Sequence, residues 1–226
     1  MSRNEVIINN QKFKVPTDFV NQTKNFIALM LLYDCAVREI TTKLEILDRE
    51  LGTLTTRNPI TTIKSRVKKP QSIVEKLLRL EVPLNVDSIP QHLNDVAGVR
   101  VICSYIDDIY IVADMISNQD DIQVLEIKDY IQFPKENGYR SLHLIVEVPV
   151  FLSDGKHYAK VEIQIRTIAM DFWASLEHEI RYKKDHRHIE LVSEELFDCA
   201  ETIAKTDQKM LDIRNLIDDE NSKNNF

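Results

Sequence analysis

The sequence predicts an α+β protein in which a mixed β-sheet of about five strands is flanked by helices, with a long helix toward each end of the chain. Two observations carry this prediction. Short runs rich in β-branched residues occupy the middle of the chain, with helical patterns between and around them. Regular apolar series lie near both ends. The 226 residues, 43% of them hydrophobic, are enough for one domain with helical extensions.

The first predicted element is a long N-terminal helix. Residues 1–17 show little pattern, and Pro16 with Thr17 is a helix-start signal. An apolar series follows in alternating steps of four and three, which places its side chains on one stripe of a helix. Its members are Phe26, Met30, Tyr33, Val37, Ile40, Leu44, Leu47 and Leu51.

A matching series predicts a second long helix near the other end. It consists of Ile189, Val192, Leu196, Cys199, Ile203, Met210, Ile213 and Ile217, with Thr206 interrupting it. The two helices could pack on the core, on each other or on a second subunit, so a homo-oligomer is one open alternative.

The middle of the chain predicts the sheet. Strand-like runs occupy 99–103, 122–127, 142–148 and 158–165, and Asp154-Gly155 predicts a hairpin between the last two. Helical patterns occupy roughly 70–80, 107–118 and 168–183. We therefore divide the chain into an N-terminal helical extension (1–55), a catalytic domain (56–184) and a C-terminal helix with a frayed tail (185–226).

Composition excludes several classes of site. The chain has only four glycines, all far apart, so it lacks Gly-rich phosphate loops, and side chains must hold any bound phosphate. Cys35, Cys103 and Cys199 suggest neither a disulfide framework nor a zinc ribbon. Without a signal peptide or an apolar run of membrane-spanning length, we expect a soluble cytoplasmic protein with no membrane partner.

The distribution of charge points to an anion site. The net charge of −7 argues against a general nucleic-acid binder. Yet residues 64–79 hold six basic residues against one acid. This basic segment is either a solvated face or a site for an anion.

Two acidic residues could add a metal site. Period-two alternation on 161–166 places Glu162, Gln164 and Arg166 on one face, which could equally be an ordinary exposed face. Asp95 precedes another strand, where an acid is commonly a turn residue. If Asp95 meets Glu162, the two carboxylates suit Mg²⁺ with substrate phosphates. Donors to a polyphosphate would then come from Arg66, Lys68, Ser72 and Lys76.

A polar loop at 128–143 is the third candidate segment. Pro134 and Asn137-Gly138 mark it as a loop, and loops on rigid scaffolds often carry function. Tyr139 could stack on a base and His143 could touch phosphate, although either residue could instead be structural.

Five ordered motifs resemble the synthetase domain of the RelA/SpoT family, over about residues 60–183. They are Arg66-Val67-Lys68 with Ser72, then 95–100, 137–143 and 162–167, and finally 173–183. The short chain, with a helix before and after this region, is similar to the small alarmone synthetases. The resemblance implies a nucleotidyltransferase-like fold, a tetramer and a stringent-response enzyme.

The implied reaction moves the β,γ-pyrophosphate of ATP onto the 3′-hydroxyl of GTP or GDP, giving pppGpp or ppGpp and AMP. By resemblance, Arg66 and Arg100 sandwich the adenine, and Lys68, Ser72 and Lys76 bind the phosphates of ATP. Asp95 and Glu162 hold Mg²⁺, and Glu162 also activates the hydroxyl. Tyr139 stacks on guanine, and the remaining residues near the acceptor are Asn137, Arg140, His143 and Arg166.

The sequence departs from the family pattern at two points, and two alternative functions stay open. The chain lacks the His-Asp dipeptide of the family's hydrolase domain, so we expect a synthetase only. Glu126 replaces the arginine of an Arg-x-Lys-Asp pattern, which leaves the choice among GTP, GDP and GMP open. The rivals are a pyrophosphokinase of the same fold acting on adenine nucleotides or the tRNA 3′ end, and a non-catalytic nucleotide sensor. Regulation by alarmone, RNA or metal ions stays open.

Overall fold

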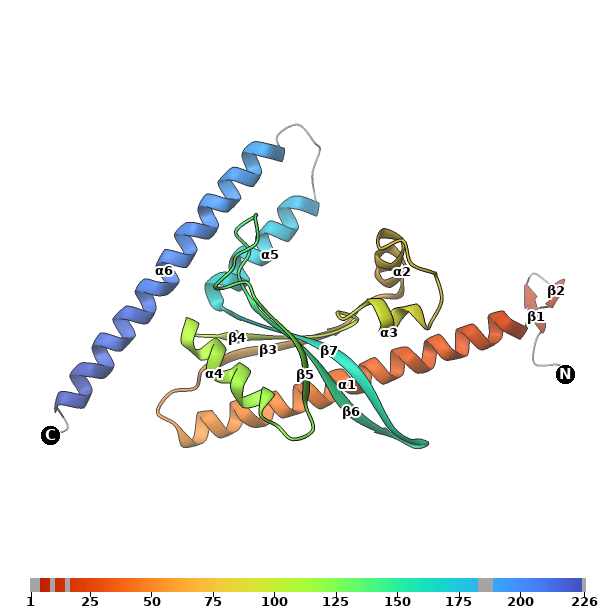
Figure 1. The fold of residues 1–226 in the computed structure, drawn as a ribbon, viewed down its shortest axis with the longest axis horizontal. Helices are drawn as coiled ribbons and strands as arrows, with labels where there is room; N and C mark the ends of the chain where they lie inside the picture. Colours follow the sequence, from red (N-terminus) through yellow and green to blue (C-terminus); the bar gives the residue numbers. More distant parts are fainter. Residues whose placement is uncertain (1–4, 9–10, 15–16, 183–188, 225–226) are drawn as a thin grey trace.

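The computed structural model describes residues 5–8, 11–14, 17–182 and 189–224 (Figure 1). Its main sheet has five strands in the order β3-β4-β7-β6-β5, with β4 and β7 parallel and the other neighbours antiparallel. The predicted mixed sheet is therefore confirmed. The strands are β3 Ile60–Val67, β4 Ala97–Cys103, β5 Gln123–Asp129, β6 Leu142–Leu152 and β7 Gly155–Thr167.

Most strands lie where the sequence predicts them, and the hairpin at Asp154-Gly155 joins β6 to β7 as expected. The exception is β3, which the prediction missed. This strand lies at the sheet edge, and of its residues only Ile60 is buried. Because most of its side chains are exposed Thr, Lys, Ser and Arg, the strand lacks the apolar alternation by which strands are recognised.

The predicted helices are also present. They are α1 Thr17–Leu54, α2 Pro70–Arg79, α4 Ile106–Ser117, α5 Ile168–Tyr182 and α6 Ile189–Asn224. The one-turn helix α3 Ser88–His92 and the hairpin of β1 Glu5–Ile8 with β2 Gln11–Lys14 were not predicted. Residues 1–17 carry no pattern from which the hairpin could be predicted, because four-residue strands are too short to show a period. The division at residues 55 and 184 stays a prediction.

Helices α1 and α4 cover one face of the sheet (Figure 1). Tyr33, Ile40 and Leu44 of the first apolar series are fully buried against the strands, and the flanking members of that series are partly buried. The N-terminal stripe therefore packs on the core of its own chain.

The second apolar series behaves differently. On α6, Met210, Ile213 and Ile217 are 50%, 43% and 53% exposed, whereas the buried positions of this helix include Ala200 and Asp207. The C-terminal part of this stripe is thus largely open in the single chain, and the alternative of a second subunit stays a prediction.

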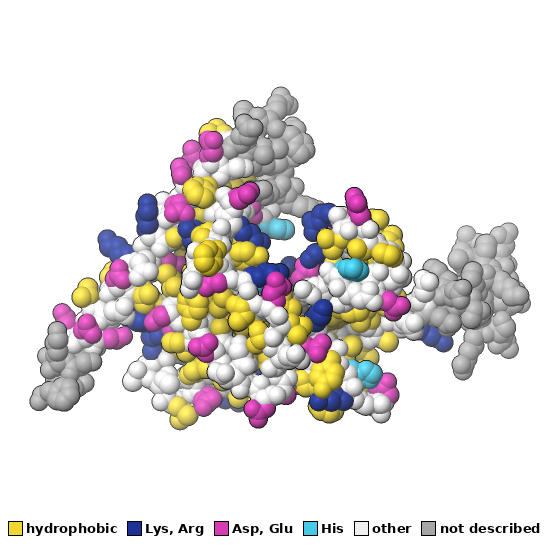
Figure 2. Space-filling model, viewed as in Figure 1, with side chains coloured by type: hydrophobic (Ala, Val, Ile, Leu, Met, Phe, Trp, Pro, Cys, Tyr) yellow, Lys and Arg dark blue, Asp and Glu magenta, His cyan; other side chains and the backbone are white. Residues whose placement is uncertain are grey.

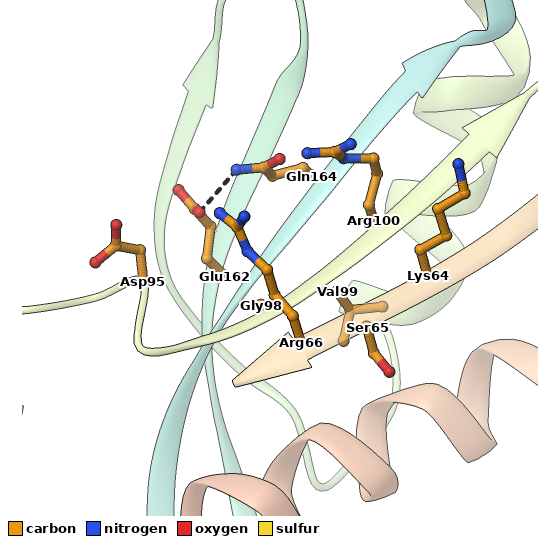
Figure 3. A pocket seen from close by; sticks show the side chains of 9 residues that line it. All are labelled: Lys64, Ser65, Arg66, Asp95, Gly98, Val99, Arg100, Glu162 and Gln164. Atoms are coloured by element: carbon orange, nitrogen blue, oxygen red, sulfur yellow. Dashed lines mark hydrogen bonds between the residues drawn. The ribbon is translucent and has the colours of Figure 1, made fainter. Parts of the chain in front are cut away.

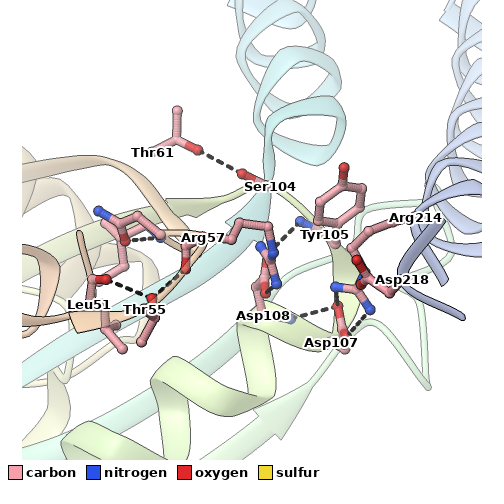
Figure 4. Close-up of polar contacts among 12 residues, drawn as sticks. Leu51, Thr55, Arg57, Thr61, Ser104, Tyr105, Asp107, Asp108, Arg214 and Asp218 are labelled. Atoms are coloured by element: carbon pink, nitrogen blue, oxygen red, sulfur yellow. Dashed lines mark hydrogen bonds and ion pairs between the residues drawn. The ribbon is translucent and has the colours of Figure 1, made fainter. Parts of the chain in front are cut away.

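A cluster of ion pairs fixes α6 to the rest of the chain (Figure 4). Arg214 of α6 donates two hydrogen bonds to Asp107 of α4, at 3.0 and 2.6 Å. Arg57 does the same to the buried Asp108, at 2.7 and 2.6 Å. Both guanidinium groups lie about 5 Å from the ring of Tyr105, at 4.9 and 5.2 Å. This cluster joins the loop after α1, the start of α4 and the C-terminal half of α6.

Across the described residues, no helix combines the length and the apolarity that crossing a bilayer requires.

Candidate active site

The face of the sheet opposite α1 carries polar side chains at every second position. Buried Val99 and Ile163 alternate along β4 and β7 with the half-buried Arg100, Glu162 and Gln164. Because neighbouring side chains of a strand point to opposite faces, one face fills the core and the other presents polar groups. A pocket of about 190 Å³ opens on the polar face (Figure 3). It is lined by Lys64, Ser65, Arg66, Asp95, Gly98, Val99, Arg100, Glu162 and Gln164.

Strand pairing brings the basic edge strand to this pocket. Arg66 of β3 pairs with Gly98 of β4, and Gly98 pairs in turn with Glu162 of β7. Lys64 pairs with Arg100 in the same ladder. Since Gly98 has no side chain, space remains between Arg66 and Glu162, and Lys and Arg side chains gather around this hollow in Figure 2.

Asp95 lies at one end of the pocket, between two lysines. Lys68 and Lys76 each approach its Oδ2 at 2.7 Å. Burial raises the pKa of Asp95, but the hydrogen bonds from the two lysines outweigh burial and hold the pKa below its usual value. The group is therefore an anion at neutral pH, with a second oxygen, Oδ1, that is buried without a hydrogen-bond partner.

Glu162 lies at the centre of the pocket on β7. His143 Nδ1 is 3.1 Å from Oε1, and Gln164 Nε2 donates to Oε2 at 2.8 Å. Burial raises the pKa of Glu162, but the hydrogen bonds from His143 and Gln164 bring it below its ordinary value. Both carboxylate oxygens are thus oriented, and the group is ionised at neutral pH.

Tyr139 lies next to this carboxylate, in the loop before β6. Its hydroxyl is 2.8 Å from His143 Nε2 and accepts a hydrogen bond of 2.8 Å from Arg166. Because an ionised carboxylate only accepts, Nδ1 of His143 carries the proton that faces Glu162, and Nε2 shares the second hydrogen bond with the Tyr139 hydroxyl. A chain of hydrogen bonds therefore runs from Arg166 through Tyr139 and His143 to Glu162.

Aromatic and basic groups surround Tyr139. The ring of Tyr130 lies edge-on to it, with centroids 6.0 Å apart, and Lys135 Nζ lies 4.9 Å from the Tyr139 ring centre. Arg166 is only 2% exposed, and burial lowers the pKa of its guanidinium. The arginine therefore supports Tyr139 from within the protein.

Known proteins are similar to this chain in sequence and in fold. Residues 65–187, more than half of the chain, match the family described as "Region found in RelA / SpoT proteins". The chain belongs to the RelA/SpoT family. The predicted family and fold class are thereby confirmed.

Relatives of similar length are found within the RelA/SpoT family. The GTP pyrophosphokinase YwaC of Bacillus subtilis is 47% identical over 189 residues, which are 84% of this chain and 90% of YwaC. The crystal structure of small alarmone synthetase 2 from Bacillus subtilis superposes with a TM-score of 0.76 at 46% identity, covering 84% of this chain and 98% of that one. The crystal structure of small alarmone synthetase 1 of the same organism, bound to its product pppGpp, superposes with a TM-score of 0.80 at 36% identity. The match covers 86% of this chain and 98% of that one.

Not every residue predicted from the family motifs points into the pocket. Asn137 donates to Glu177 of α5 and accepts from the backbone N–H of Tyr139. Arg140 donates to Glu201 of α6 at 2.7 Å. These contacts favour a role in holding the loop over direct contact with a nucleotide. Ser72 lies one turn before Lys76 on α2 and is half buried.

The residues near the site that the predicted set omits include Lys64, Gln164 and Asp171. A sequence signal exists for Lys64 and Gln164. Lys64 lies two residues from Arg66, and Gln164 lies two residues from both Glu162 and Arg166, so each shares a strand face with predicted site residues. Asp171, in the first turn of α5, accepts from Arg100 and Arg166. No local pattern marks it, because its partners come from separate strands.

Metal ligation can be judged from the donor set. Within the described ranges, no group of three or more His, Cys, Asp and Glu side chains could enclose an ion. Two carboxylates, Asp95 and Glu162, nevertheless face one pocket, and Oδ1 of Asp95 lacks a partner. Such a pair fits Mg²⁺, which takes one or two carboxylates together with water and substrate phosphates.

Proposed function

We propose that this RelA/SpoT-family chain is a GTP pyrophosphokinase that transfers the β,γ-pyrophosphate of ATP to the 3′-hydroxyl of GTP or GDP and releases AMP. The names of its relatives support this enzyme class. The observation that carries the proposal is one pocket that holds Arg66, Arg100 and the pair Asp95 and Glu162, with Tyr139 of the neighbouring loop joined to Glu162 through His143.

The donor half of the site is the basic end of the pocket. Arg66 and Arg100 project into it from neighbouring strands, and planar guanidinium groups stack on a purine without any Gly-rich loop. Lys68 and Lys76 lie beside Asp95 and would meet the phosphates, with Ser72 on the same helix. The small alarmone synthetase 1 structure with AMPCPP, an ATP analogue, supports nucleotide binding by this fold.

Asp95 and Glu162 would hold Mg²⁺. When bound, this ion neutralises charge on the transferred phosphates. Lys68 and Lys76 keep Asp95 ionised, so it is ready to take part at neutral pH.

Glu162 would take the proton of the attacking 3′-hydroxyl. In phosphoryl transfer, catalysis comes mainly from positioning and charge neutralisation, so a base of low pKa suffices if it lies in place. His143 and Gln164 fix its two oxygens. The acceptor guanine would stack on Tyr139, with Asn137, Arg140, His143 and Arg166 holding the loop and the ring.

Assembly belongs to the proposal as well. We propose a cytoplasmic homo-oligomer, a tetramer by family resemblance, in which the exposed apolar side chains of α6 are covered. Met210, Ile213, Leu216 and Ile217 would lie in such an interface. Light scattering during size-exclusion chromatography tests it, and a monomer at micromolar concentration would contradict it.

Labelled ATP tests the activity. ATP carrying ³²P at the γ-phosphate is incubated with GTP, GDP, GMP, ATP or tRNA, and the products are separated by chromatography. We expect label on GTP or GDP together with equimolar AMP. Label on ATP or tRNA would favour the adenine-nucleotide or tRNA alternative, and binding without turnover would favour the sensor.

A further inference from the structure

Asp171 links the two halves of the site. It lies in the first turn of α5, directly after β7, and its side chain is 15% exposed. Oδ1 accepts hydrogen bonds from Arg100 at 3.1 Å and from Arg166 at 3.3 Å. Oδ2 lies 3.8 Å from Lys64 Nζ. One carboxylate therefore contacts cations from β3, β4 and β7.

The two arginines serve different substrates in the proposed function. Arg100 lines the donor pocket, whereas Arg166 supports Tyr139 through a hydrogen bond of 2.8 Å. Arg166 also donates to Gln164, which in turn donates to Glu162, both at 2.8 Å. Asp171 is thus connected to the donor side, to the acceptor side and to the carboxylate between them.

We propose that Asp171 is a positioning residue that sets the orientation of Arg100 for ATP and of Arg166, and through it Tyr139, for the acceptor nucleotide. This inference rests on the proposed roles of Arg100 and Tyr139. Arginine has many rotamers, and a bond to a fixed carboxylate selects one of them before the ligand arrives. A negative charge here also offsets repulsion among three cations while leaving an excess of positive charge for ATP.

The burial of Arg166 makes this contact specific. At 2% exposure its guanidinium is removed from water, and among the described residues Asp171 is its only ion-pair partner. Without Asp171, only the neutral oxygens of Gln164 and Tyr139 would accept from it. We expect the guanidinium to turn toward solvent and the Tyr139 ring to lose its support.

Steady-state kinetics of Asp171→Ala test the proposal. We expect KM for ATP and KM for GTP each to rise about tenfold, because a hydrogen bond to a charged group is lost on both sides. Asp171→Asn keeps one oxygen acceptor and should show smaller rises in both, which preserves the test if the Ala variant folds poorly. Asp121→Ala is the matched control, since it removes a carboxylate bonded to Lys43 of α1, behind the sheet. It should leave both KM values unchanged.

The Arg100→Ala background separates positioning from general destabilisation. If Asp171 acts on ATP through Arg100, adding Asp171→Ala to Arg100→Ala leaves KM for ATP unchanged while KM for GTP still rises. Equal effects of Asp171→Ala on KM for ATP in both backgrounds would overturn the inference, as would unchanged KM values with a lower melting temperature. If Arg100→Ala itself leaves KM for ATP unchanged, the proposed donor site fails together with the inference.

Discussion

The carboxylate of Glu162 is held by two kinds of constraint. Its strand fixes the backbone, and His143 and Gln164 fix its two oxygens. Hydrogen bonds to the charged form outweigh burial, so the group is ionised and its lone pairs are directed. The attacking hydroxyl loses its proton while the new bond forms. The base that takes this proton therefore needs a fixed position more than a raised pKa.

Replacing Glu162 by Gln should slow synthesis by ~10²–10⁴-fold, since the amide keeps the shape but loses both charge and basicity. ATP binding should persist, because Arg66 and Arg100 are unchanged. Single-turnover rates and calorimetry with an ATP analogue measure the two effects. Glu147→Gln, the same change on neighbouring β6 outside the pocket, is the control. Turnover near that of the unmodified enzyme in the Glu162 variant would remove the residue from the mechanism.

At the level of single residues, the sequence predicts those site residues whose side chains suit the reaction and whose spacing places them on one face of a strand or helix. Glu162 and Arg166 share a strand face, and Lys76 follows Ser72 by one helical turn, so spacing alone groups them. Asp171 could not be predicted in this way. Its role depends on β3, β4 and β7 lying side by side, which no local pattern specifies.

Among the structural elements, the loop before β6 depends most on its neighbours. Gly138 has φ of +84°, and Arg140 and Asn137 connect the loop to α6 and α5. A Cβ added at Gly138 would lie 2.6 Å from the Cβ of Ala200. The C-terminal helix therefore forms the wall against which the Tyr139 loop rests.

Gly138→Ala should destabilise the fold by about 3 kcal/mol, combining backbone strain with a clash against α6. KM for GTP should also rise, because the loop that carries Tyr139 must shift. Gly155→Ala is the control, since φ is +137° and nothing lies within 4 Å of the added atom. It should cost about 1–2 kcal/mol and leave KM unchanged. Urea unfolding and kinetics measure both, and similar KM values in the two variants would contradict this account of the loop.

The contribution of the α6 contacts to the free energy of unfolding should also depend on pH. Asp207 is buried and accepts a hydrogen bond from Thr167, and burial raises the pKa of its carboxyl. A carboxyl with a raised pKa favours folding fully only below its ordinary, unfolded pKa, and its contribution is lost as pH rises through the folded pKa.

Asp207→Asn keeps an oxygen for Thr167 but removes that charge. The gain in free energy of unfolding of this variant over the unmodified protein should therefore be larger at pH 8 than at pH 4. Asp212→Asn makes the same substitution at an exposed position of the same helix and is the control. A gain of equal size at both pH values in the Asp207 variant would show that the buried charge is not responsible.

At the scale of the whole molecule, helices cover one face of the central sheet, and the other face carries the candidate active site. Helices α1 and α4 pack on the apolar face and form the core with it. The opposite face can therefore carry polar side chains, which come from four strands. The hairpin at Asp154-Gly155, the apolar series of α1 and the order of helices were all predictable, because each is a local pattern of adequate length. The edge strand β3 was not, and strand order is a property of pairing that periodicity cannot supply.

The central claim is that separate residues of this one face bind donor and acceptor. It is tested most directly by measuring KM for ATP and for GTP in Arg66→Ala and Tyr139→Ala. We expect Arg66→Ala to raise KM for ATP alone. Tyr139→Ala should raise KM for GTP alone, by about tenfold to a hundredfold, since stacking on a base is worth ~1–3 kcal/mol. Equal weakening toward both nucleotides in both variants, with lowered melting temperatures, would contradict the claim.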